Sequence, residues 1–263
     1  MVNFELKSHY GYEDLLQVIR VLRSPEGCPW DREQTHESIR RGFLEETYEV
    51  IEAIEKKDTA LMCEELGDVL MQVVFHADIE ADAGRFTMDE VIDGVVKKLV
   101  FRHPHVFANV QADNTEQVLV NWEQLKQQEK GQSTATETLE AVASTLPQLW
   151  RAEKIQKKAA KAGFDWADIN GALDKLEEEV AELRRAAQAG NGCVEEELGD
   201  VLFAAVKVGR FAGVDPEDAL SGTCEKFIRR FRSVEDKLRA EGLAMEDVPL
   251  ERLTALWDEV KRS

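Results

Sequence analysis

The chain has 263 residues and a formal charge of −19 at pH 7, with 52 acidic residues against 33 basic ones. That imbalance excludes a general binder of nucleic-acid polymers, which needs a basic surface for the phosphate backbone. No apolar run approaches the roughly 18 residues of a membrane-spanning helix, and the N-terminus lacks a signal peptide's apolar core, so we expect no membrane partner and a cytoplasmic location.

The first half of the chain predicts a series of amphipathic helices. Apolar residues recur at three- and four-residue steps in 43–54 and again in 61–77. Gly84 then marks a helix end, and Thr87 with Glu90 forms a capping-box pattern that starts the next helix. This half therefore predicts consecutive helices joined by short turns.

The second half continues in the same way. Gly190 and Gly213 mark helix ends, and Asp215 with Pro216 supplies an N-cap followed by a first-turn proline. No segment has the alternation of a convincing strand, so we predict an all-α fold. The polar, Ser- and Thr-rich stretch 127–142 predicts a linker. The expected organisation is an N-terminal domain, a linker and a C-terminal domain at residues 1–126, 127–146 and 147–263.

One acidic octet occurs twice in this chain. Residues 63–70 read CEELGDVL and residues 195–202 read EEELGDVL, and recurrence at a fixed interval indicates a duplicated unit. Aligning the halves on the octet also pairs a tryptophan, an E-E-x-x-E helix, a K-x-x-x-R pair and a W-x-x-x-K pair in the same order. The matched residues are Trp30/Trp166, Glu45/Glu178, Glu46/Glu179, Glu49/Glu182, Glu65/Glu197, Asp68/Asp200, Lys98/Lys226, Arg102/Arg230 and Trp122/Trp257.

The duplicated acids indicate a metal site. Residues three apart on a helix share a face, so Glu46 and Glu49 project together, as do Glu65 and Asp68. If the two helices pack as an antiparallel hairpin, the four carboxylates converge and raise one another's pKa values unless a cation neutralises them. Oxygen ligands without paired histidines suit Mg²⁺, or Mn²⁺ as a substitute, rather than zinc.

The same residues have ordinary structural interpretations. In a chain that is 32% charged, a single E-x-x-E motif is usually a solvated helix face, and only its recurrence in both halves favours a metal. The Lys/Arg pairs are either surface charges or phosphate contacts. Trp122 and Trp257 are more often core anchors than stacking platforms.

Two further features are expected to be structural. Gly67 and Gly199 each cost about 1 kcal/mol of helix stability relative to alanine, so their repetition predicts a close approach, such as that of the partner helix. The cysteines show no C-x-x-C pair or zinc spacing, and His103 and His105 have no counterpart in the second half. The four cysteines are Cys28, Cys63, Cys193 and Cys224.

Two rival functions come from other classes. A di-iron carboxylate bundle would use E-x-x-H motifs from two helices, and Glu33 with His36 is the only obvious one. A non-catalytic helical regulator that senses nucleotides or binds a protein is harder to exclude, because binding and hydrolysis need the same acids.

The duplicated helix pair resembles the two-domain MazG nucleoside triphosphate pyrophosphohydrolases over roughly residues 10–262. The resemblance also includes GCPWD at 27–31, RHPHVF at 102–107 and GFDW at 163–166. It implies tandem all-α domains that dimerise as helical bundles. It further implies Mg²⁺-dependent hydrolysis of nucleoside triphosphates, ribo- or deoxyribo- and aberrant ones included, to monophosphate and pyrophosphate, a house-cleaning role in the nucleotide pool.

The resemblance also implies individual roles. It makes Glu179, Glu182, Glu197 and Asp200 the catalytic metal ligands of the second half, with Glu46, Glu49, Glu65 and Asp68 at the same positions in the first. It places nucleotide contacts at Lys226, Arg230 and Trp257, with Lys175 and Glu178 as further candidates. In some relatives only the C-terminal copy is active, but here the N-terminal copy keeps all four acids. Because a lone pair of amphipathic helices cannot cover its own apolar stripe, we also expect a homodimer.

Overall fold

The structure, a computed structural model, describes residues 4–108, 114–129, 131, 133–189 and 193–262. Over these residues all regular secondary structure is helical, which confirms the all-α prediction. The chain divides into two compact units, residues 1–126 and 127–263. Within the described ranges, no helix combines the length and apolar character that a membrane span requires.

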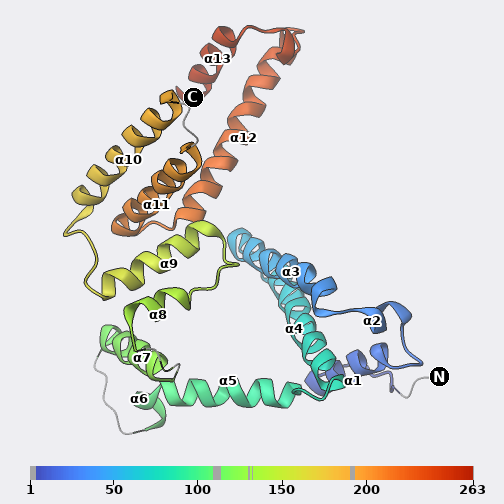
Figure 1. The fold of residues 1–263 in the computed structure, drawn as a ribbon. Helices are drawn as coiled ribbons and strands as arrows, with labels where there is room; N and C mark the ends of the chain where they lie inside the picture. Colours follow the sequence, from blue (N-terminus) through green and yellow to red (C-terminus); the bar gives the residue numbers. More distant parts are fainter. Residues whose placement is uncertain (1–3, 109–113, 130, 132, 190–192, 263) are drawn as a thin grey trace. The chain divides into compact units, whose positions relative to one another are not determined.

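The first unit is built around one helical hairpin, formed by α3 and α4 (Figure 1). Lys57 turns the chain with a φ of 56°, and the Asp58 side chain then accepts hydrogen bonds from the first amides of α4. This tight connection forces α3 and α4 to pack antiparallel. The helices of this unit are α1 (Tyr12–Arg23), α2 (Pro29–Glu33), α3 (His36–Lys56), α4 (Thr59–Asp82), α5 (Met88–Arg102), α6 (Pro104–Phe107) and α7 (Thr115–Glu129).

The core of the first unit joins α1 to the hairpin. Ile19 from α1, Ile39 from α3 and Val74 and Phe75 from α4 are buried together. The predicted helix boundaries are confirmed nearby, since Gly84 adopts a φ of 66° after α4 and Thr87 caps α5 through a capping box. Burial of these apolar side chains fixes the hairpin that carries the first set of acids.

The second unit repeats the hairpin with α10 and α11, which also lie side by side (Figure 1). Gly213 ends α11 in a left-handed conformation, and Asp215 caps α12, both as predicted; Gly190 lies outside the described residues. The helices are α8 (Ala135–Glu140), α9 (Gln148–Lys161), α10 (Ile169–Ala189), α11 (Val194–Ala212), α12 (Pro216–Ala240) and α13 (Leu250–Arg262), with a 3₁₀ turn at Met245–Asp247.

The stretch 127–146, expected to be a linker, includes the end of α7 and the short helix α8, which Thr134 caps. The partner helix does not make the close approach expected at Gly67 and Gly199, because a Cβ at either position would meet no heavy atom of the described residues within 4 Å.

Candidate metal centre and nucleotide pocket

The second hairpin brings three of the predicted acids together. Glu179 on α10 and Glu197 and Asp200 on α11 each offer a carboxylate oxygen, and these oxygens lie within 4.8 Å of one another. Glu182 lies outside this group of three and forms an ion pair with Arg185 across 2.9 Å. Its charge nevertheless acts on Glu197. Three of the four carboxylates expected to converge therefore meet here, and Glu182 does not join them.

The electrostatics of this cluster favour a bound cation. Burial raises the pKa of Glu197, and the neighbouring charges of Glu182, Asp200 and Glu179 raise it further. Such a shift means that the ionised carboxylates repel one another, and a divalent cation would relieve that repulsion. The donors are all oxygens, so the residues fit Mg²⁺ or Mn²⁺.

Lys175 is the cation that the second hairpin already supplies. Its Nζ lies 2.7 Å from Glu179, one turn further along α10, and 2.8 Å from Glu178. The hydrogen bonds that Lys175 donates to both carboxylates raise its pKa, so the ammonium stays charged. It neutralises part of the acidic cluster and lies beside the candidate metal ligands.

The first hairpin holds a similar cluster. Glu46 and Glu49 on α3 and Glu65 on α4 offer oxygens within 4.8 Å of one another. Burial and the charge of Asp68 raise the pKa of Glu46, and burial and the charge of Glu49 raise that of Glu65. Asp68 lies outside the group of three but acts on both through its charge.

The two clusters differ in their cations. The alignment that pairs Glu46 with Glu179 places Gly42 opposite Lys175, and no ion pair reaches Glu46, Glu49 or Glu65 in the described part of the chain. The first cluster is thus a more purely anionic site than the second. The sequence already contains this difference between Gly42 and Lys175, but an alignment that considers only the acidic residues does not reveal it.

A pocket of about 300 Å³ adjoins the second cluster. Glu179 and Asp200 form part of its wall, so it opens directly onto the candidate metal ligands. Trp166, from the turn before α10, forms another part, and Lys207 from α11 lies over that tryptophan with its Nζ 5.3 Å from the ring centroid. The alignment of the two halves pairs Trp166 with Trp30 but predicts no role for Trp166. The other lining residues are Gly163, Phe164, Asp165, Ala172, Lys175, Phe203 and Ala204.

The remaining predicted nucleotide contacts lie on other elements. Lys226 is exposed and Arg230 half-buried on α12, and neither lines the pocket beside the acids. Trp257 on α13 packs against the core formed by α12 and α13, with its ring centroid 5.0 Å from that of Phe227. The core side chains there are Val234, Leu238, Val248 and Leu256.

The corresponding residues of the first unit are arranged differently. Arg102 is buried, with its guanidinium 5.3 Å from the centre of the Trp122 ring, and Lys126 lies over the same ring at 5.0 Å. Lys98, one turn before Arg102, is half-buried. Two cations of its own unit therefore lie within cation–π range of Trp122.

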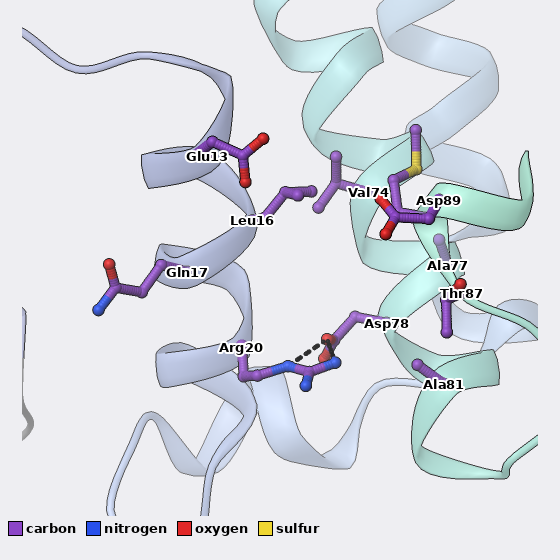
Figure 2. Close-up of a pocket in the computed structure, with 11 residues that line it drawn as sticks. Glu13, Leu16, Gln17, Arg20, Val74, Ala77, Asp78, Ala81, Thr87 and Asp89 are labelled. Carbon is purple, nitrogen blue, oxygen red and sulfur yellow. Dashed lines mark hydrogen bonds and ion pairs between the residues drawn. The ribbon is translucent and has the colours of Figure 1, made fainter. Parts of the chain in front are cut away.

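The first unit also has a cavity of about 440 Å³, but it lies away from the acidic cluster. Figure 2 shows it between α1, α4 and the start of α5, with Arg20 directed toward Asp78. The two side chains form an ion pair at 3.1 Å. Since Asp78 follows Asp68 by ten residues, it lies about 15 Å further along α4. The volume of this cavity is therefore no guide to where the candidate metal ligands of the first unit lie.

His36 belongs to a separate polar network in the first unit. Its Nε2 lies 2.5 Å from Glu80, and its Nδ1 lies 2.7 Å from Nδ1 of His76. Arg85 also binds Glu80, and these hydrogen bonds lower the pKa of Glu80 to about 2. His36 is thus engaged by groups of α4, and this arrangement gives no support to a di-iron site built on Glu33 and His36.

Comparison with known proteins identifies the family. The model of the MazG nucleotide pyrophosphohydrolase domain matches twice, at residues 34–107 and 169–234, and each match contains one acidic hairpin. The chain belongs to the MazG family. The resemblance inferred from the repeated motifs is thereby confirmed.

Several proteins are similar to almost the whole chain. A nucleoside triphosphate pyrophosphohydrolase/pyrophosphatase MazG from Thermotoga maritima is 44% identical over 95% of this chain and 95% of its own length. A nucleoside triphosphate pyrophosphohydrolase from Escherichia coli K12 is 45% identical over 94% of this chain and 96% of its own. An uncharacterized Bacillus subtilis protein, YabN, is 45% identical over 97% of this chain but only 52% of its own length.

Proposed function

We propose that this MazG protein hydrolyses nucleoside triphosphates to nucleoside monophosphates and pyrophosphate, with Mg²⁺ held by Glu179, Glu182, Glu197 and Asp200. The observation that carries the proposal is the meeting of Glu179, Glu197 and Asp200 within 4.8 Å of one another. Two of them, Glu179 and Asp200, line a pocket that Lys175 and Trp166 also line. The pyrophosphohydrolase names of the relatives agree with it.

The chemistry requires neutralised phosphates and an activated water. Bound Mg²⁺ would supply both, by offsetting phosphate charge and lowering the pKa of a water. Lys175 contributes a fixed positive charge beside Glu179, placed to bind a phosphate oxygen once the carboxylates are shared with a metal. Glu178 is exposed next to Lys175 and is a candidate for orienting the water that attacks the α-phosphorus, as are the ligands themselves.

Lys226 and Arg230 are proposed to bind the departing pyrophosphate. They lie one helical turn apart on α12 and share a face. Neither forms an ion pair with an acid in the described ranges, so both charges are free for a phosphate. Trp257, packed in the core beside Phe227, would then act mainly by fixing the face that Lys226 and Arg230 present.

The first cluster is proposed to bind Mg²⁺ through Glu46, Glu49, Glu65 and Asp68, with less catalytic output. Three of its acids meet as in the second cluster, but the group includes Glu49 and leaves out Asp68, and Gly42 provides no charge where Lys175 does. A triphosphate there would lack that phosphate contact. The physical difference agrees with dominance of the C-terminal copy.

A homodimer is proposed because matched apolar positions of both hairpins are exposed. Leu66 is 50% and Leu198 47% exposed, and Leu70 is 39% and Leu202 51% exposed. Exposed apolar side chains that recur at equivalent positions are expected to be covered by another helical surface. A second copy would supply one.

Product analysis with the full chain tests the function. Each of the common nucleoside triphosphates would be incubated with Mg²⁺, and monophosphate, pyrophosphate, diphosphate and phosphate would be quantified separately. Monophosphate and pyrophosphate in equal amounts support the proposal. Diphosphate with phosphate would place the attack at the γ-phosphorus and overturn it, and binding without turnover would favour the nucleotide-sensing regulator. A house-cleaning role in the cytoplasmic nucleotide pool further predicts turnover of aberrant triphosphates.

A further inference from the structure

The pocket beside the second cluster has one acidic end and one aromatic end. Glu179, Asp200 and Lys175 lie at the first, and Trp166 and Lys207 lie at the second. Asp200 and Lys207 are seven residues apart on α11, which corresponds to about 10 Å along the helix axis. A group at the aromatic end is therefore too far from the metal ligands to be a phosphate bound by them.

The turn that carries Trp166 is held rigidly. Gly163 adopts a φ of 89°, which closes α9 and directs the chain toward α10. Asp165 then accepts two hydrogen bonds, at 2.6 and 2.8 Å, from Nη2 of Arg210 on α11. Trp166 is seated against Gly171 of α10, where a Cβ would lie only 3.3 Å from the tryptophan side chain. These contacts fix an aromatic face on the pocket wall before any ligand arrives.

Lys207 is the second element of the aromatic end. Its ammonium lies 5.3 Å from the centre of the Trp166 ring, within the range of a cation–π contact. It forms no ion pair with an acid in the part of the chain that the structure describes. A planar ligand stacked on Trp166 would displace the Lys207 ammonium from the face of the ring. The ammonium would then lie at the edge of that ligand.

We propose that this end of the pocket binds the nucleobase of the substrate, stacked on Trp166, and that Lys207 selects bases with an oxo group at the edge it faces. The inference rests on the proposed function, because the metal-bound triphosphate sets the distance to the base. Aromatic stacking accepts every base, so Trp166 supplies affinity without selectivity.

Selectivity follows from the hydrogen-bonding groups of Lys207. An ammonium has three donors and no acceptor. It pairs with the oxo group of guanine, uracil or thymine, whereas the amino group of cytosine or adenine at the same edge is itself a donor. Substrates with oxo bases, hypoxanthine included, are therefore favoured over their amino counterparts.

The first unit has Trp30 as the counterpart of Trp166 but lacks the two lysines of this site. The alignment of the octets places Phe75 opposite Lys207, and Phe75 is buried in the core of its unit. Gly42 stands opposite Lys175. Base selection of this kind is thus a property of the second copy alone.

The test measures kcat/KM of the full chain for dUTP and dCTP, which differ at C4 (oxo or amino) and in the proton on the adjacent N3. The wild type should favour dUTP, and Lys207→Met, which keeps the apolar stem but removes the donors, should bring the ratio toward one. Lys154→Met changes an exposed lysine of α9 and serves as the matched control. A ratio that Lys207→Met leaves unchanged, or a wild type without preference, overturns the role of Lys207.

Stacking is tested by Trp166→Ala and by the milder Trp166→Phe. Trp166→Ala should weaken binding of both substrates about ten- to a hundredfold, seen in KM and in calorimetric titration of their α,β-methylene analogues, and Trp166→Phe should restore most of it. Circular dichroism checks the fold of each variant. Unchanged affinity in both variants overturns the site. Pyrophosphate release that persists in that case leaves the proposed function standing, whereas no release from any triphosphate in the wild type refutes the function itself.

Discussion

Lys175 lies one helical turn before Glu179 and contacts its buried carboxylate at 2.7 Å. The equivalent contact cannot form in the first unit, where the chain has Gly42. Two hairpins with the same acids therefore differ in net charge at their candidate metal sites.

Removal of Asp200 should abolish most of the activity. In Asp200→Ala one carboxylate of the acidic cluster is lost from an exposed position, so the helices should persist while Mg²⁺-dependent pyrophosphate release falls on the order of a thousandfold. Asp68→Ala is the matched change in the first unit and should reduce total turnover less. Full activity of a folded Asp200→Ala protein would assign the chemistry to the first unit. Activity in the double variant Asp68→Ala/Asp200→Ala would refute the metal site altogether.

Lys175→Met should separate metal binding from substrate binding. Loss of the charged hydrogen-bond donor should raise KM for triphosphates about tenfold or more, because a contact between an ammonium and a phosphate is worth roughly 1.5–3 kcal/mol. Mg²⁺ affinity measured without nucleotide should not fall, since the variant frees Glu178 and Glu179. A loss of Mg²⁺ binding with unchanged KM would contradict this role.

The metal-free protein should be destabilised at neutral pH by its own carboxylates. Burial and neighbouring acids raise the pKa of Glu197 above its ordinary value of 4.5. The folded state then holds its proton more tightly than the unfolded chain, so the destabilising contribution is absent below pH 4.5 and grows as pH rises through the folded pKa. Thermal unfolding should show a larger Mg²⁺-induced increase in Tm at about pH 7.5 than at about pH 5.

Glu197→Gln provides the matched control for that experiment. Without metal it should raise Tm at about pH 7.5, because it removes one repelling charge, and it should diminish the gain from Mg²⁺, because it removes a ligand. A lower Tm without metal, combined with an undiminished Mg²⁺ effect, would mean that the cluster is not under electrostatic strain.

The exposed leucines of the second hairpin should mediate self-association. Leu198→Glu with Leu202→Glu places two charges on an apolar surface that is already solvent-accessible in the single chain, so folding should be retained. Sedimentation should show a dimer for the wild type and a smaller species for the variant at micromolar concentration. A wild-type monomer would contradict the homodimer directly.

The sequence alone established the helical fold, the duplication and the acids. Helix periodicity and the caps at Thr87 and Asp215 are local properties, and the i,i+3 spacing of Glu46 and Glu49 needs only helix geometry to place both on one face. These signals depend on neighbouring residues, so they can be recognised without knowing how the helices pack. The family followed from the same repeated motifs.

Only the tertiary structure decided which side chains share a site. Lys207 and Trp166 are 41 residues apart in the sequence (207 − 166), and their contact depends on the seating of Trp166 against Gly171 and on the ion pair of Asp165 with Arg210. Local patterns carry no information about such contacts, because they arise from the packing of α9, α10 and α11. For the same reason the sequence suggested a close approach at Gly67 and Gly199, where the folded units leave open space.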